Sequence, residues 1–180
     1  MLIKRENSLL LIVDIQEKLA PAIFQADAAV QNNVRLLKAT EQLSIPTFIS
    51  EQYVRGLGPS VSAIRNATVH GHFFEKTHFS CTAEPDVLEK LHATGRKQIL
   101  LTGMESHVCV LQTGLGLLAA GFAVFLVADA TSSRTPENRS AAIDRLRANG
   151  AHIVTTEMVL FEWLEKAGTD EFRQILPLIK

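Results

Sequence analysis

The chain has 180 residues, of which 47% are hydrophobic and 21% charged, and its formal net charge is −1. This composition is typical of a globular protein, and the length suits one domain over residues 1–180. The balanced charge, without a run of lysine or arginine, argues against a nucleic-acid partner held by electrostatics. No apolar run reaches the ~18 residues of a membrane span, so no membrane partner is expected.

The two cysteines, Cys81 and Cys109, are too few for a disulfide framework and lack metal-ligand spacing. The apolar run at the start of the chain is interrupted by Asp14, and no small-residue cleavage site follows it. It therefore lacks the pattern of a signal peptide. We expect a soluble protein of the cytoplasm.

Short apolar runs bounded by Gly, Pro or charged residues recur along the chain. Continuous runs of this kind are typical of strands that are buried on both faces, as in a parallel sheet. The predicted strands are Ser8–Ile15, Pro46–Ser50, Gln98–Thr102, Ala123–Ala128 and Ala151–Thr155, and Val69–Phe74 is a candidate sixth strand.

Amphipathic segments lie between these runs, and several end at a glycine, as helices commonly do. The predicted helices are Val30–Leu43, Val87–Thr94, Val108–Ala120, Pro136–Asn149 and Thr169–Leu176. The alternation predicts an α/β fold of three layers, α/β/α, with a mainly parallel, Rossmann-like sheet of about six strands. Ligands of such folds sit at the carboxyl ends of the strands.

Asp14 stands near the end of the first predicted strand. A carboxylate after five apolar residues needs a partner or a function, or it caps the following helix, and the sequence leaves both interpretations open. The next strand leads into the loop Ser50–Ser60, which contains two glycines and a proline. This loop is either a substrate-contacting loop or a plain surface excursion.

The stretch FFEKTHFSCT places Lys76 beside two aromatic residues, with His78 and Cys81 close behind. A lysine in this setting either extends to solvent or serves the site. Cys81 fits a small core residue, although its spacing from His78 also permits a Cys-His pair.

In GMESHVCVLQTG, Gly103 allows a sharp turn after a strand, and Glu105 or Ser106 can cap a helix that begins near His107. Cys109 then lies in the first helical turn, where the helix dipole would lower the pKa of a thiol. A nucleophile needs such a position, but packing cysteines also occur there.

Together, LLLIVDIQ with Asp14, FFEKTHFS with Lys76 and GMESHVCVLQT with Cys109 resemble the isochorismatase-like (cysteine hydrolase) superfamily. The similarity runs from Ser8 to about Lys180. The stretches TEQLSIPTFISEQYVRGLGPS and FLVADATSSRTPENRSAAIDRLRANGAHIVTTE are similar to the isochorismatase-domain-containing branch. The resemblance implies an isochorismatase-like hydrolase domain over the whole chain.

The resemblance also implies a mechanism. Asp14 would act as general base, Lys76 would stabilise the charged forms, and the Cys109 thiolate would attack a small amide-like substrate to form an acyl-enzyme. Backbone N–H groups of Glu105 and Cys109 would form the oxyanion hole. In the family the turn contains a non-proline cis peptide, here Met104–Glu105.

Nicotinamidases of this superfamily carry an Asp and several His after the second strand, whereas ISEQYVRGLG contains no histidine. Since His70, His72 and His78 come later at other spacings, neither a catalytic metal nor another cofactor is expected. Isochorismatases proper cleave a vinyl ether without a cysteine nucleophile, so Cys109 favours the amidase-like reaction.

Tyr53, Phe79 and His107 are candidate walls of a pocket for a small-molecule substrate. The apolar fraction and the habit of the family suggest a homo-oligomer. An alternative function is that of a non-catalytic ligand-binding or scaffolding member of the family. A flavodoxin-like nucleotide binder is disfavoured, because DIQEKLAP has no glycine after the first strand.

Overall fold

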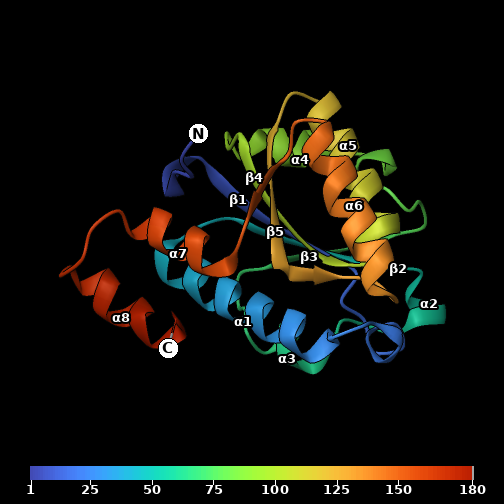
Figure 1. The fold of residues 1–180 in the computed structure, drawn as a ribbon, viewed down its shortest axis with the longest axis horizontal. Helices are drawn as coiled ribbons and strands as arrows, with labels where there is room; N and C mark the ends of the chain where they lie inside the picture. Colours follow the sequence, from blue (N-terminus) through green and yellow to red (C-terminus); the bar gives the residue numbers. More distant parts are fainter. Residues whose placement is uncertain (180) are drawn as a thin grey trace.

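A computed structural model describes residues 1–179. It contains one sheet of six strands in the order β3-β2-β1-β4-β5-β6, and the pairings between these strands are parallel (Figure 1). The strands are β1 (Ser8–Val13), β2 (Thr47–Gln52), β3 (His72–Lys76), β4 (Gln98–Met104), β5 (Ala123–Ser132) and β6 (His152–Val154). The predicted α/β fold is confirmed.

Helices cover both faces of this sheet (Figure 1). One face packs against α1 (Ala26–Leu43), α3 (Ser62–Arg65), α7 (Thr156–Leu164) and α8 (Asp170–Ile179). The other face packs against α4 (Val87–Ala93), α5 (Leu111–Ala119) and α6 (Pro136–Ala148). Leu10 and Ile12 of β1 enter the first core, while Leu9 and Leu11 enter the second. Because both faces of the strand are buried, its sequence is continuously apolar.

Short helical turns join the longer elements at several places. They are η1 (Arg5–Asn7), η2 (Ala20–Ala22), α2 (Val54–Leu57), η3 (Cys81–Ala83) and the π-helical turn η4 (Ser106–Val110). Side-chain caps start α6 and α7, since Thr135 accepts a hydrogen bond from Asn138 N before α6 and Thr155 accepts one from Met158 N before α7. None of the helices in residues 1–179 is long and apolar enough to cross a bilayer.

The largest differences from the sequence prediction concern β3, η4 and α7. The sixth strand is His72–Lys76 rather than Val69–Phe74, because β3 is an edge strand with exposed side chains and lacks a continuous apolar pattern. The predicted helix Val108–Ala120 begins instead as the π-helical turn η4. Helix α7, which directly follows β6, was not predicted.

The carboxyl ends of β1 and β4 approach each other closely at Gly103. Its φ angle is +112°, and a Cβ atom at this position would lie 2.0 Å from Val13 O. Only glycine fits both the angle and the contact. This close approach brings the turn after β4 next to Asp14, which directly follows β1.

Candidate active site

Three segments at the carboxyl end of the sheet contribute Asp14, Lys76 and Cys109. Asp14 follows β1, Lys76 is the last residue of β3, and Cys109 lies in η4 after β4. The ammonium nitrogen of Lys76 lies 2.7 Å from Asp14 Oδ2, and both side chains are fully buried. Cys109 lies near enough to Asp14 for the charge of the carboxylate to raise the pKa of its thiol. The three predicted residues therefore meet in one place.

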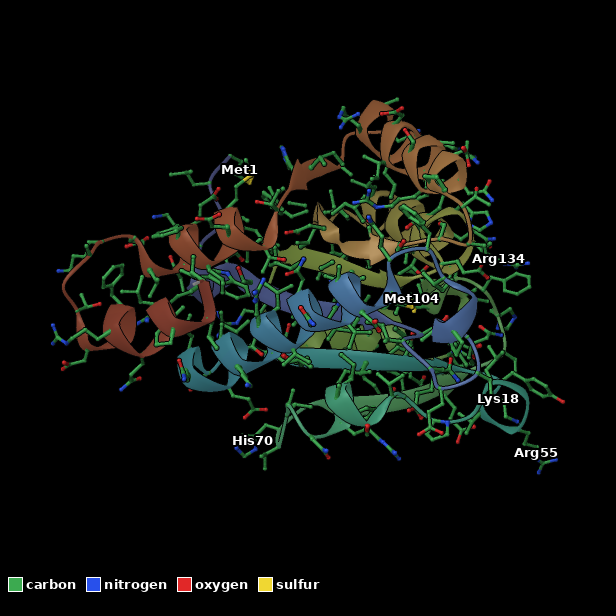
Figure 2. The ribbon with its side chains drawn as sticks, turned by 60° about the horizontal axis from the view of Figure 1, so that its bottom comes forward. Met1, Lys18, Arg55, His70, Met104 and Arg134 are labelled. Carbon is green, nitrogen blue, oxygen red and sulfur yellow. The ribbon has the colours of Figure 1, made fainter. Side chains whose placement is uncertain are left out.

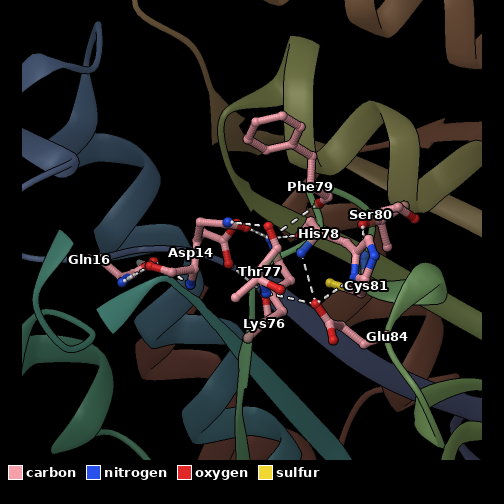
Figure 3. Close-up of polar contacts among 12 residues, drawn as sticks. Asp14, Gln16, Lys76, Thr77, His78, Phe79, Ser80, Cys81 and Glu84 are labelled. Carbon is pink, nitrogen blue, oxygen red and sulfur yellow. Dashed lines mark hydrogen bonds and ion pairs between the residues drawn. The ribbon is translucent and has the colours of Figure 1, made fainter. Parts of the chain in front are cut away.

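Lys76 is surrounded by oxygen acceptors (Figure 3). Its ammonium donates to Gln52 Oε1 and to the carbonyls of His78 at 3.2 Å and Phe79 at 3.1 Å. Burial alone lowers the pKa of Lys76, but the charge of Asp14 and the neighbouring thiols raise that pKa above its ordinary value. The lysine is thus a buried, hydrogen-bonded cation and does not extend to solvent.

Asp14 is held from the side of β2. Its φ angle of +52° is in the left-handed region, its N–H donates to Ser50 O at 3.1 Å, and its Oδ1 accepts from Ser50 Oγ at 2.7 Å. Burial raises the pKa of this carboxyl, while Lys76 and Ser50 oppose the rise. Asp14 is therefore a stronger proton acceptor than an exposed aspartate. None of these hydrogen bonds is a helix cap.

The sequence argument that a helix start lowers the pKa of the Cys109 thiol is wrong. Burial, followed by the negative charge of Asp14, raises the pKa of Cys109 to about 12, and Lys76 offsets only part of this rise. Only 6% of Cys109 is exposed, so water screens its interaction with the Asp14 carboxylate poorly. At neutral pH the resting side chain is a thiol, and it needs a base to ionise.

The second cysteine, Cys81, is fully buried in η3 near the same groups. Burial raises the pKa of its thiol, and the nearby Asp14 adds to the rise. His78 is exposed, and its ring contacts Glu84 rather than a thiol. Cys81 therefore occupies a core position and forms no Cys-His pair with His78.

The turn that carries Cys109 is anchored to the segment Thr131–Arg134 at the end of β5. The peptide bond Met104–Glu105 is cis, as the resemblance implied. Arg134 Nε lies 2.6 Å from Glu105 Oε1, and Arg134 Nη2 lies 3.2 Å from Glu105 Oε2, so the two side chains form a bidentate ion pair. Ser106 Oγ lies 3.0 Å from Thr131 Oγ1, and His107 Nδ1 lies 3.0 Å from Ser133 Oγ. Consecutive residues of the turn are thus fixed by one neighbouring segment.

Sequence reasoning missed the polar partners supplied by β2 and by Gln16. Ser50 binds Asp14, and Gln52 binds Lys76. Gln16 Nε2 donates to Gln52 O at 2.9 Å and to Gly58 O at 2.6 Å, which ties the Ser50–Ser60 loop to the end of β1. The available signal was their place at the ends of predicted strands, the same signal that identified Asp14.

The three candidate pocket walls differ in their surroundings. Tyr53 is 57% exposed and lines a cavity of about 330 Å³ beside Lys76, together with Arg55 and Glu84. Phe79 is 55% exposed, and its ring projects from the polar cluster (Figure 3). His107 is half-buried against Ser133. Neither Phe79 nor His107 lines that cavity.

A larger cavity, of about 730 Å³, lies between the segment after β1 and helices α1 and α3. It contains none of the three converging residues, so the chemistry of the side chains, and not the size of the cavity, identifies the candidate site. Figure 2 shows exposed Lys18, Arg55 and Arg134 toward the same end of the molecule as Met104. Within residues 1–179, no group of three or more His, Cys, Asp or Glu side chains is arranged to hold a metal ion.

The sheet is that of the isochorismatase-like α/β/α fold, with a carboxylate, an ammonium and a thiol at its strand ends. The profile of the isochorismatase domain matches residues 8–158. The chain belongs to the isochorismatase family, and the resemblance found in the sequence is confirmed.

Relatives of this chain come from several eukaryotes. Isochorismatase family protein 1B of Dictyostelium discoideum is 38% identical over 97% of this chain and 87% of its own length. Isochorismatase domain-containing protein 2 of Danio rerio is 39% identical over 97% and 87%. The secreted isochorismatase effector Isc1 of Phytophthora sojae is 37% identical over 97% and 85%. A cytoplasmic location for this chain stays a prediction.

Solved structures of similar fold cover almost the whole chain. The MAR1 ribonuclease of Caenorhabditis elegans has a TM-score of 0.94 at 34% identity, covering 99% of this chain and 92% of that one. YcaC of Pseudomonas aeruginosa, solved with covalent acrylamide, has a TM-score of 0.91 at 26% identity, covering 98% and 91%. The Escherichia coli YcaC gene product, an octameric hydrolase of unknown specificity, has a TM-score of 0.93 at 23% identity, covering 99% and 89%.

Proposed function

We propose that this protein is a cysteine-dependent hydrolase of a small C–N-bonded, amide-like substrate, acting through Asp14, Lys76 and Cys109 and an acyl-enzyme. The observation that carries the proposal is the buried ion pair of Asp14 and Lys76 near the Cys109 thiol, whose pKa both charges influence. A buried carboxylate with a raised pKa is suited to accept a proton, and the lysine supplies a fixed positive charge.

In the first step, Asp14 accepts the thiol proton of Cys109 and the sulfur attacks the carbonyl carbon of the substrate. The carbonyl π electrons move to oxygen, where the backbone N–H groups of Glu105 and Cys109 would bind the oxyanion. Arg134 and its neighbours support this role, because they fix the turn to which Glu105 belongs. Lys76 balances the charge of the thiolate until the new C–S bond forms.

In the second step, the C–N bond breaks and protonated Asp14 gives its proton to the leaving amine. Asp14 then removes a proton from water, and the resulting hydroxide releases the acid from Cys109 by cleaving the thioester. The cycle restores thiol, carboxylate and ammonium. It consumes one water and requires no other co-reactant.

One observation favours an amide-like substrate. A vinyl-ether cleavage has no need of a nucleophilic cysteine, whereas this chain keeps a thiol near the general base. The Pseudomonas aeruginosa relative was solved with covalent acrylamide. Acrylamide bonds to nucleophiles through its C=C bond, so this adduct supports a reactive nucleophile in the family and leaves the substrate open.

The proposal is tested by screening small amides, carbamates and hydroxamates against the wild-type protein, with Cys109→Ala and Asp14→Asn as matched variants. We expect both variants to lower kcat/KM by roughly 10³-fold or more while circular dichroism stays unchanged. A folded Cys109→Ala protein that retains full activity on a confirmed substrate would refute the mechanism.

A second candidate function is RNA cleavage, because a structure that is 34% identical to this chain is described as a ribonuclease. The net charge of −1 disfavours an RNA partner. Incubation of the wild-type and Cys109→Ala proteins with a mixed RNA substrate decides between amide hydrolysis and RNA cleavage. RNA cleavage that is lost in Cys109→Ala would favour RNA as the substrate. RNA cleavage that persists in Cys109→Ala but disappears on repurification would indicate a contaminant. A scaffolding protein would instead retain partner binding in Cys109→Ser and show no turnover in the screen.

We also propose that the chain forms a homo-oligomer. Large apolar side chains are exposed at several places, including Tyr53, Phe79 and Phe161. The Escherichia coli YcaC gene product, which has the same fold, is octameric. Size-exclusion chromatography with light scattering tests this proposal, and a monomer at high concentration would contradict it.

A further inference from the structure

The carboxyl end of β2 contacts both charged members of the candidate site, and the mechanism above does not use it. Side chains two positions apart on a strand point to the same face. Ser50 and Gln52 are both buried and point toward the site, while Glu51 between them points away and accepts a hydrogen bond from Ser60 N at 2.6 Å. One strand end thus presents two polar groups to the site and one away from it.

Ser50 fixes Asp14 in two ways. Its hydroxyl donates to Asp14 Oδ1 at 2.7 Å, and its carbonyl accepts from Asp14 N at 3.1 Å. The first contact sets the rotation of the carboxylate, and the second sets the backbone that carries it. With Oδ1 occupied, Oδ2 is the oxygen that faces Lys76, at 2.7 Å.

Gln52 fixes Lys76, and its own amide is fixed in turn. Its Oε1 accepts from Lys76 Nζ, while its Nε2 donates to Thr77 O at 2.8 Å. The backbone N–H of Gln52 donates to Gln16 Oε1 at 2.7 Å, and its carbonyl accepts from Gln16 Nε2. Because the amide nitrogen is already committed to a carbonyl, the amide oxygen is directed at the ammonium.

We propose that Ser50 and Gln52 are positioning residues of this site: Ser50 orients the Asp14 carboxylate as a general base, and Gln52 holds the Lys76 ammonium beside it. The inference rests on the proposed function, because it assigns these two residues to the same reaction. Neither side chain is expected to touch the substrate. Each acts through the charged residue that it binds.

The two roles have opposite consequences for pH dependence. The groups that face Asp14 are Lys76 from β3, Cys81 from η3 and Cys109 from η4, together with Ser50. A donor to a carboxylate favours its charged form, so the loss of Ser50 Oγ raises the pKa of Asp14. A hydrogen-bond acceptor stabilises the charged form of an ammonium, so the loss of Gln52 Oε1 lowers the pKa of Lys76.

The test is the pH profile of kcat/KM on a confirmed substrate. We expect Ser50→Ala to lower kcat/KM by about tenfold, the effect of one hydrogen bond to a charged group, and to move the acidic limb to higher pH. Gln52→Met should move the basic limb to lower pH. Ser50→Thr, which keeps the hydroxyl, should restore the acidic limb. Glu51→Gln is the matched control on the opposite face of the strand and should leave both limbs unmoved.

A measurement without substrate separates this inference from the proposed function. The carboxyl carbon of Asp14 is titrated by ¹³C NMR in aspartate-labelled protein, and its signal is identified by its loss in Asp14→Asn. An upward shift of this titration in Ser50→Ala, absent in Glu51→Gln, supports the positioning role even if Cys109→Ala turns out to retain turnover. If Cys109→Ala is inactive but Ser50→Ala leaves both the titration and the acidic limb unchanged, Ser50 is merely structural and the inference is overturned.

Discussion

The candidate site consists of a buried floor and an exposed rim, which are built in different ways. The floor comprises Asp14, Lys76 and Cys109; the Asp14 and Lys76 side chains are fully buried, and each has polar partners from a neighbouring strand. The rim comprises Tyr53 and Phe79, whose exposed fractions are 57% and 55%. Folding of the chain fixes the first set and leaves the second largely uncovered.

This difference separates chemistry from recognition. Charges in the floor are desolvated, so their interactions are strong and their geometry is set by hydrogen bonds within one chain. Apolar rings in the rim gain little from folding, and they gain most when a substrate or a second chain covers them. Substitutions in the floor should therefore affect stability and pH dependence, whereas substitutions in the rim should affect substrate binding.

The largest effect on stability is expected at Gly103, where the floor requires a residue without a side chain. Gly103→Ala would place a Cβ atom 2.0 Å from Val13 O at a φ angle of +112°, so we expect a loss of about 4 kcal/mol or more in the free energy of unfolding. Gly121→Ala is the control, because Gly121 has a φ angle of +86° with nothing within 4 Å. It should cost only the backbone strain, about 1–2 kcal/mol.

Urea unfolding of both variants measures these values. The difference between them isolates the close approach of β1 and β4, since both positions carry the strain of a positive φ angle. Equal losses would mean that β1 and β4 move apart without cost and that the floor is less tightly built than the contact implies.

The next effect concerns the ion pair. Lys76→Met leaves Asp14 buried without its cation, and breaking a buried pair costs about 3–5 kcal/mol. The cost should shrink as the pH falls, because protonation removes the unpaired charge. The double variant Asp14→Asn/Lys76→Met should be more stable than Lys76→Met at pH 7. If the single and double variants unfold at the same urea concentration at every pH, the pair contributes nothing to the stability of the floor.

A smaller effect is expected in alkaline solution. The pKa of Cys109 is raised from 9.0 in the unfolded chain to about 12 in the folded one, so its contribution to stability is complete below pH 9 and is lost as the pH rises toward 12. Above pH 9 this thiol should lower the free energy of unfolding by up to about 1.4 kcal/mol per pH unit. Cys109→Ser, which does not ionise, should show a shallower slope between pH 8 and 10. An identical slope would mean that the thiol is not desolvated in the folded protein.

Much of the fold and the identity of the floor could be predicted from the sequence. Continuous apolar runs predicted the parallel sheet, and Asp14 was visible as a carboxylate placed where such a run ends. Ser50 and Gln52 were not recognised, because a polar residue at a strand end has no pattern that names its partner. Edge strand β3 was misplaced because its exposed side chains give no buried run.

The pKa of Cys109 could not be read from the sequence, because it depends on tertiary structure. A helix start favours a thiolate, whereas burial and the adjacent Asp14 favour the thiol, and the chain alone gives neither the burial nor the separation. The same holds for the anchoring of Glu105 by Arg134, two residues 29 positions apart in the chain.

The smallest effect on stability is expected at the rim. Phe79→Ala removes a side chain that is 55% exposed, and its carbonyl, which accepts a hydrogen bond from Lys76, is unaffected by the substitution. We expect the free energy of unfolding to change by no more than about 0.5 kcal/mol, whereas Phe125→Ala, at 1% exposure in the core, should cost about 3–5 kcal/mol. On a confirmed substrate, Phe79→Ala should raise KM more than it lowers kcat, because its ring would contact the bound substrate and not the reacting sulfur. A loss of stability close to that of Phe125→Ala would place Phe79 in the packed interior, and the division between floor and rim would fail at this residue.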